Sequence, residues 1–326
     1  MKKTALCTTL LLVLLFVLTI VGVCIGSVAI PLSTVVEAVF GTGNGSNASQ
    51  SAVFIIRNIR LPRVVCAVLA GSALALGGLV FQSVFRNPMA DSYILGVSSG
   101  ASCLIGFNML LAIGIGNTFA ALIGSICTTA MLFATAKGDH NRLLLSGIAV
   151  NFLLSALTTL TIYLGRRQLD TVLYWTMGSL SGSSWPRAAI LAAVVVLSSF
   201  VLMARASVLD ILLLDDSTAI SSGLDAKVAR MLLLAMASAL TAVVVSFCGI
   251  IGFVGLMSPH FARLIIGAKH RGLIPTSMLL GAVILLLSDI LARCIVAPSE
   301  LPIGVITSIL GAPMFLVLLR RHKSGF

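Results

Sequence analysis

Asp289 and Arg293 are two charged residues inside an apolar stretch near the end of the chain. A spacing of four places them on one face of a helix, where a carboxylate and a guanidinium can form an ion pair. A carboxylate inside a membrane is costly and is usually paired. We therefore interpret the two residues as a structural pair near the outer end of a membrane span. A proton relay through Asp289 is the alternative.

Arg57, Arg60 and Arg63 cluster just before another long apolar run. If the N-terminus lies inside the cell, this cluster lies outside, against the usual excess of basic residues at cytoplasmic ends. An arginine cluster there can dock an acidic soluble partner through complementary charge. Contact with lipid headgroups is the other interpretation.

Patterns typical of catalysis are missing from the sequence. No segment fits GxxxxGK[ST], the loop that binds nucleotide phosphates. The four histidines are scattered, and the seven cysteines include no CxxC pair and lie mostly in apolar runs. We predict a protein that is not an enzyme and that binds no metal or cofactor itself.

The longest polar interruption runs from Arg205 to Arg230. Its centre predicts a short helix with Asp216 as N-cap and Gly223 as a left-handed stop. Asp225 then caps a second helix, which runs into the membrane. A capped surface helix between two spans can serve as a binding surface for a soluble partner. The alternative is an ordinary loop that contains one helical turn.

The composition sets the class of protein that must position these residues. Hydrophobic residues make up 59% of the 326 residues and charged residues only 10%, with a mean hydropathy of +1.13; a soluble domain has about 25% charged residues. We predict an all-α polytopic membrane protein, a single transmembrane domain over residues 1–326 with about ten helices. The predicted spans are 6–30, 62–85, 92–112, 117–136, 142–164, 187–205, 227–248, 250–268, 274–296 and 302–320.

Small residues recur at a spacing of four within these spans, as in Ala67, Gly71 and Ala75. Small residues at this spacing let helix backbones approach closely in lipid. We interpret them as packing residues and not as part of a functional site.

The basic residues predict the orientation. With the N-terminus inside, thirteen lysines and arginines fall at cytoplasmic ends and seven at outer ends, so both termini are expected in the cytoplasm. The formal charge of +11 is then explained by cytoplasmic ends and anionic lipid rather than nucleic acid. Pro259 interrupts the eighth span, and the 41 residues between Lys227 and Lys269 must cross twice, which predicts short or irregular crossings.

Several stretches together resemble the permease subunits of bacterial ABC importers for iron-siderophores, haem and cobalamin, the FecCD-type family. The resemblance covers the whole chain in order. The stretches are Arg60–Arg63, Gln82 with Asn87–Asp91, Leu95–Ala101, Gly252–Leu256 with Pro259–His260, and Glu300–Gly304 with Gly311–Pro313.

The resemblance implies a ten-helix subunit that works as a homodimer or heterodimer in the bacterial cytoplasmic (inner) membrane, with the transport path at the dimer interface. Two copies of a separate ATP-binding subunit would bind the cytoplasmic face and use ATP. An extracytoplasmic substrate-binding protein would dock outside. The expected cargo is a ferric siderophore first, then haem, then cobalamin. An ion-coupled secondary transporter with Asp289 as its carrier carboxylate is the alternative function.

The resemblance also implies roles for particular residues. ATPase coupling falls in a segment of about 209–227, at Asp215, Asp216, Ser217, Thr218, Ala219, Ile220, Ser221, Gly223 and Leu224. Docking of the binding protein falls on Arg57, Arg60, Arg63 and Arg293. The cytoplasmic gate falls on Asn87, Met89, His140 and Asn141, although His140 is bulkier than the small hydroxyl residues usual near that position in the family.

Overall fold

The computed structural model describes residues 2–26, 30–41, 50–136, 140–165, 169–214, 219 and 221–321. Within these ranges the chain is helical and contains no strand. The elements are α1 (Lys2–Cys24), α2 (Leu32–Phe40), α3 (Gln50–Ile55), the π-helix η1 (Ile56–Arg60), α4 (Leu61–Val84), the 3-10 helix η2 (Ser92–Leu95), α5 (Val97–Leu110), α6 (Asn117–Ala136), α7 (His140–Leu164), α8 (Leu169–Thr176), α9 (Trp185–Ala204), α10 (Ala206–Leu213), α12 (Ala226–Cys248), α13 (Val254–Ile266), α14 (His270–Cys294) and α15 (Ile303–Arg321).

Seven helical stretches of the described chain are long and apolar enough to cross a membrane. They are Thr4–Cys24, Gln50–Val84, Asn117–Thr135, Arg142–Leu164, Trp185–Ala204, Ala226–Cys248 and His270–Cys294. The shorter apolar helices Val97–Leu110, Val254–Ile266 and Ile303–Val317 occupy the places of the other three predicted spans. Each predicted span therefore corresponds to an apolar helix, while ten membrane crossings remain a prediction.

Helix α4 forms the centre of the bundle and packs against α14, α12, α13 and α9. Nearly all its residues after Leu61 are buried. A Cβ atom on Gly71 would collide with the carbonyl of Gly281 on α14, and the reverse also holds, so the two backbones approach closely. This confirms the expectation that small residues at helical spacing permit tight packing in lipid.

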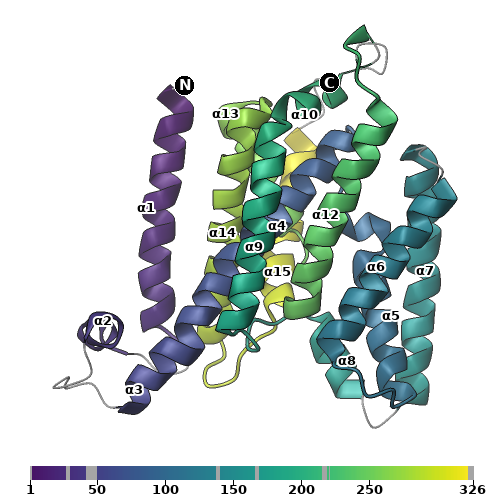
Figure 1. The fold of residues 1–326 in the computed structure, drawn as a ribbon. Helices are drawn as coiled ribbons and strands as arrows, with labels where there is room; N and C mark the ends of the chain where they lie inside the picture. The colour runs from purple at the N-terminus through teal and green to yellow at the C-terminus, as the bar shows by residue number, and fades with distance from the viewer. Residues whose placement is uncertain are drawn as a thin grey trace.

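The remaining helices flank this centre (Figure 1). Helices α5, α6 and α7 pack on one another, and α6 joins them to α12. Helix α1 packs mainly on α14. The start of α1, the end of α15 and α10 lie at one end of the bundle, whereas α2, α3 and the α14–α15 loop lie at the other (Figure 1). We call these the α10 end and the α2 end.

One sequence expectation about a helix boundary was wrong, and several short helices were not predicted. The second span was placed at 62–85, yet the helix continues without a break from Gln50 through η1 to Val84. Arg57 and Arg60 therefore lie on the helix and not before it, and their side chains find backbone carbonyl partners there. The sequence also carries no signal for the short helices α2, α8 and α10, because none of them is long enough to be recognised as a span.

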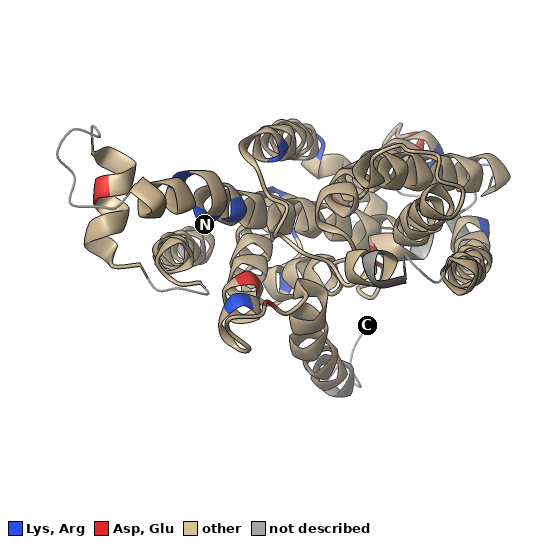
Figure 2. Cartoon of the chain, turned by 90° about the horizontal axis from the view of Figure 1, so that it is seen from below, with Lys and Arg blue, Asp and Glu red and all other residues tan. Residues whose placement is uncertain are grey.

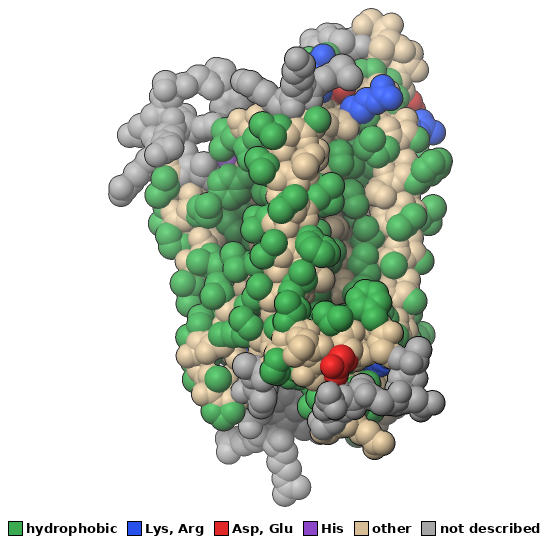
Figure 3. Space-filling view, turned by 90° about the vertical axis from the view of Figure 1, so that its left-hand side faces the viewer, with side chains coloured by type: hydrophobic (Ala, Val, Ile, Leu, Met, Phe, Trp, Pro, Cys, Tyr) green, Lys and Arg blue, Asp and Glu red, His purple; other side chains and the backbone are tan. Residues whose placement is uncertain are grey.

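The surface of the bundle is mainly apolar. Large side chains such as Phe16, Phe152 and Phe200 point outward, and each is more than 60% exposed. Hydrophobic side chains cover most of the face with α1, and basic side chains gather at its upper edge (Figure 3). Seen from below, charged positions are few along the whole bundle (Figure 2). This distribution is typical of helices that face lipid.

Candidate functional site

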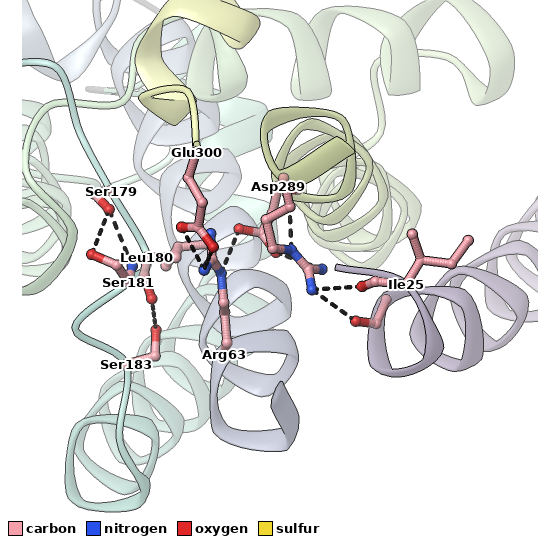
Figure 4. A network of polar contacts seen from close by, with 10 residues as sticks. Ile25, Arg63, Ser179, Leu180, Ser181, Ser183, Asp289 and Glu300 are labelled. Atoms are coloured by element: carbon pink, nitrogen blue, oxygen red, sulfur yellow. Dashed lines mark hydrogen bonds and ion pairs between the residues drawn. The ribbon is translucent and has the colours of Figure 1, made fainter. Parts of the chain in front are cut away.

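Arg63 lies at the centre of an ion-pair network at the α2 end of the bundle. Its Nε atom is 2.9 Å from Asp289 Oδ1, and its Nη1 atom donates to both carboxylate oxygens of Glu300 at 2.9 Å. Arg63 and Asp289 are buried, while the Glu300 side chain is 35% exposed. Figure 4 shows α4, α14 and the loop before α15 meeting at these three side chains.

Arg293 completes the neutralisation of Asp289. Its Nη2 atom lies 2.9 Å from Asp289 Oδ2, an ion pair whose atoms are not aligned for a hydrogen bond. The same guanidinium donates from Nη1 to the carbonyl oxygens of Gly22 and Ile25 at 3.0 and 2.9 Å. The predicted pairing of Asp289 with Arg293 is confirmed, and Arg293 also binds the end of α1.

Arg60 binds the same helix end. Its Nη1 atom donates to Val23 O at 2.8 Å and to Cys24 O at 2.7 Å. The last four carbonyls of an α-helix have no partner within the helix, and they carry the negative end of its dipole. Arg60 and Arg293 together satisfy four consecutive carbonyls, from Gly22 to Ile25.

The four arginines expected to dock a partner therefore differ in access. Arg60, Arg63 and Arg293 are buried and hold internal partners. Arg57 is exposed, although its Nε atom donates to Ala38 O at 2.6 Å. The sequence predicted that Arg63 and Arg293 belong to the same site, but it did not predict Glu300 as a partner of Arg63. Glu300 lies in a loop 237 positions further along the chain, and such a contact leaves no periodic pattern in the sequence.

The described part of the coupling segment lies at the α10 end, between α10 and α12. Gly223 has a φ of +75°, which confirms the predicted left-handed stop, and Leu224 N donates to Ala219 O at 3.1 Å. Ala219 is buried and Ser221 is exposed. Asp215, Asp216, Ser217, Thr218 and Ile220 lie outside the described residues.

Asp225 begins the next helix as expected. Its Oδ1 atom accepts a hydrogen bond from Val228 N at 3.1 Å, so it caps α12. The short exposed turn formed by Ser222 and Gly223 therefore lies just before the capped N-terminus of α12.

The gate residues are only partly described. Asn87 and Met89 are exposed in the turn after α4, where Asn87 Oδ1 accepts from Met89 N at 2.9 Å. Helix α7 begins at His140, but the side chains of His140 and Asn141 lie outside the described part of the chain. Further along α7, Asn151 Nδ2 donates to Tyr93 O at 2.9 Å, which joins α7 to η2.

A cavity of about 400 Å³ lies beside the contact between α5 and α7. Its walls include Ser98, Ser99, Ser102, Asn151, Ser155 and Thr158. Its lining includes hydroxyl and amide groups, and none of the described residues that line it is charged.

An apolar helical bundle with a charged network buried at one end and a capped helix start at the other is the architecture of a polytopic membrane protein. Its sequence matches the model of the FecCD transport family over residues 12–321, and the chain belongs to that family. It is therefore a permease subunit of an ABC importer of the metal-chelate, cobalamin or haem type.

Individual relatives agree with this assignment. The chain is 42% identical to the cobalamin import system permease protein BtuC of Halobacterium salinarum, over 84% of this chain and 75% of that protein. It is 38% identical to the hemin transport system permease protein HmuU of Yersinia pestis, over 82% and 83%. A solved structure described as an inward-facing ABC transporter of metal-chelate type is 29% identical and superposes with a TM-score of 0.84, covering 96% of this chain and 98% of that one.

Proposed function

We propose that this permease imports a ferric siderophore across the bacterial cytoplasmic membrane. Two copies of the chain, or one copy and a related chain, would form the path. Separate ATP-binding subunits would drive it, and this chain would bind no cofactor of its own. The order of cargoes, with ferric siderophore ahead of haem and cobalamin, follows from the family resemblance. The likeness to a transporter of metal-chelate type fits all three, since each is a chelated metal.

The observation that carries the proposal is the position of the coupling segment. Gly223 and Asp225 fix an exposed turn between two helices at the α10 end, opposite the arginine network. An ATP-binding subunit that pushed on this turn would act directly on α12, which packs against the central helix α4. A movement at the α10 end would thereby reach the core of the bundle.

Docking of a substrate-binding protein belongs to the α2 end in this proposal. Arg57 offers an exposed guanidinium there. Arg63 is reachable through Glu300, the most exposed member of its network. A carboxylate of the binding protein would replace Glu300 as the partner of Arg63. Arg60 and Arg293, which are buried, would stabilise the site through their hydrogen bonds to the end of α1.

The ion-coupled alternative lacks support. A carrier carboxylate must change its partner or its protonation during each cycle. Asp289 is fully buried and lies between two arginines, Arg63 and Arg293, each at 2.9 Å. Each of its carboxylate oxygens already faces a guanidinium nitrogen, so a transported cation would first have to displace an arginine.

Uptake measurements in cells test the proposal. Uptake of labelled ferric siderophore, haem and cobalamin would be compared with and without this gene, each before and after ATP depletion. We expect loss of ferric siderophore uptake without the gene, and the same loss after ATP depletion. Uptake that survives ATP depletion but stops with a protonophore would contradict the ATP-driven mechanism.

A further inference from the structure

A second cavity lies at the α10 end, apart from the coupling turn and the α2-end network. It has a volume of about 430 Å³ and lies between the end of α4, the end of α10 and α13. Its lining residues include Gln82, Arg86, Asn87, His260, Arg263 and Leu264. Among the described residues that line it, none is an aspartate or glutamate.

Arg263 on α13 brings an unneutralised positive charge to this cavity. Its Nη1 atom donates to Gln82 Oε1, at a long 3.3 Å. Its Nε and Nη2 atoms are shielded from solvent and have no hydrogen-bond partner within the described chain. In the α2-end network, by contrast, carboxylates and backbone carbonyls bind Arg60, Arg63 and Arg293. Unpaired N–H groups at shielded positions are costly, and a turn of the side chain toward the cavity that it lines would let them meet an anion.

The neighbouring groups hold the guanidinium in place. Gln82 donates from Nε2 to Leu256 O at 2.9 Å, which fixes its Oε1 atom toward Arg263. Arg86 donates from Nε to Leu212 O at 2.9 Å and so is held at the cavity wall. Two segments from opposite halves of the chain, around Gln82 and around Arg263, thus meet at one cationic cavity.

The chemistry of the cavity selects an oxyanion. A guanidinium presents its N–H groups in a planar fork that matches two oxygens of a phosphate or carboxylate. The volume equals that of roughly fourteen water molecules in the liquid, so a phosphate group fits with part of what it is attached to.

The surroundings favour a lipid as the source of that anion. Leu264 and Ile265, next to Arg263 on α13, are 58% and 51% exposed, which makes this an apolar surface. Lys269 and Arg271 are exposed just beyond it. Basic pockets between membrane helices, on the side where basic residues gather, are typical sites for anionic lipid headgroups.

We propose that the cavity around Arg263 is a binding site for a phosphate group, supplied by the headgroup of an anionic phospholipid. The lipid would neutralise Arg263 and bridge α4 to α13 close to the coupling segment. This site is independent of the cargo and of the proposed docking surface.

Lipid retention by the purified permease, in its complex with the ATP-binding subunits, tests the site. The complex would be reconstituted in nanodiscs of dioleoyl phosphatidylcholine with an equal share of dioleoyl phosphatidylglycerol, then examined by native mass spectrometry. We expect phosphatidylglycerol to be retained over phosphatidylcholine, and Arg263→Gln to reduce this preference about tenfold, as for the loss of one charged hydrogen-bonding pair. Arg271→Gln, which removes an exposed charge outside the cavity, is the matched control and should leave the preference unchanged.

A thermal-stability arm separates the lipid from free phosphate. In neutral detergent, added dioleoyl phosphatidylglycerol should raise the melting temperature of the wild type but not of Arg263→Gln, because a ligand stabilises only a protein that binds it. If inorganic phosphate alone gives the same Arg263-dependent shift, the phosphate site stands and free phosphate is its source.

The remaining outcomes overturn the proposal. Equal lipid preference and equal thermal shifts in the wild type and in Arg263→Gln would exclude a phosphate site. Loss of the ATP-binding subunits from Arg263→Gln, with lipid retention unchanged, would instead assign the cavity to a carboxylate of that partner. Since Arg263→Gln removes a charge that no carboxylate of the described chain neutralises, we expect the variant to fold.

Discussion

The carboxylate of Glu300 pairs with the guanidinium of Arg63 in the same chain. Arg63 Nη1 lies 2.9 Å from each of the two Glu300 carboxylate oxygens. Arg63 is buried, and Glu300 is the more exposed of its two carboxylate partners. Glu300 is 35% exposed and comes from a loop, whereas Asp289 is fully buried on α14. The carboxylate that an incoming acidic partner would replace is therefore Glu300.

Glu300→Gln should strengthen docking of the substrate-binding protein. The substitution keeps the shape of the side chain but removes the charge that competes for Arg63. We expect the dissociation constant to fall about threefold to tenfold at low salt, where surface charge is least screened. Binding of the purified binding protein to the reconstituted permease would be measured at low and at physiological salt.

Glu37→Gln serves as the matched control, because Glu37 is an acidic residue at the same end of the bundle, on α2. It should leave the dissociation constant unchanged. Weaker docking in Glu300→Gln would instead mean that Glu300 positions Arg63 for the partner.

Arg60→Gln should loosen the end of α1. Arg60 satisfies the carbonyls of Val23 and Cys24, and most of the residues along α1 are not buried, so the hydrogen bonds from Arg60 are a large share of what holds its end beside those from Arg293. Loss of the charged hydrogen bonds should lower the free energy of unfolding by about 2 kcal/mol. It should also speed hydrogen exchange in the last turn of α1, measured by mass spectrometry in detergent.

Arg57→Gln is the comparison for that experiment. Arg57 is exposed, so its loss should change the free energy of unfolding by less than about 0.5 kcal/mol. Equal destabilisation by the two variants would argue against a specific anchoring of α1 by Arg60.

The sequence predicted the long apolar helices and the pairing of Asp289 with Arg293, because both depend on local spacing. It also predicted the stop at Gly223 and the cap at Asp225, which are local too. It did not predict the contacts of Arg60 with the end of α1 or of Arg63 with Glu300. Those contacts join segments far apart in the chain, and their geometry depends on how the helices pack.

Asp289→Asn should destabilise the protein without making transport independent of ATP. Removing this charge leaves Arg63 and Arg293 buried without their shared carboxylate. Breaking a buried ion pair costs about 3–5 kcal/mol, so chemical unfolding should show a loss of this size. The double variant Asp289→Asn with Arg293→Gln also removes one of the two arginine charges left without their carboxylate. It should therefore recover part of the lost free energy of unfolding.

Transport by the same variant separates structure from mechanism. For correctly inserted protein, ATP-driven uptake per molecule should remain within about twofold of the wild type. Complete loss of uptake at unchanged stability and membrane level would return Asp289 to the role of a carrier group.

Gly223→Val should uncouple the permease from its ATP-binding subunits. Gly223 has a φ of +75°, and no atom lies within 4 Å of the position that a Cβ would take, so a side chain there meets strain and not a clash. The strain is about 1–2 kcal/mol, enough to change the turn before α12 without unfolding the bundle. We expect uptake and cargo-stimulated ATP hydrolysis to fall at least about fivefold, because a coupling free energy reduced by about 1 kcal/mol corresponds to a change of this size. The amount of the variant in the membrane should be unchanged.

Gly114→Val is the matched control for a strained turn. Gly114 has the same backbone character, with a φ of +82° and free space around it, but it lies in the loop between α5 and α6. A side chain at this position should therefore carry a similar strain and leave coupling intact, because the loop is no part of the segment between α10 and α12. Equal loss of uptake in both variants would refute a special role for the turn at Gly223.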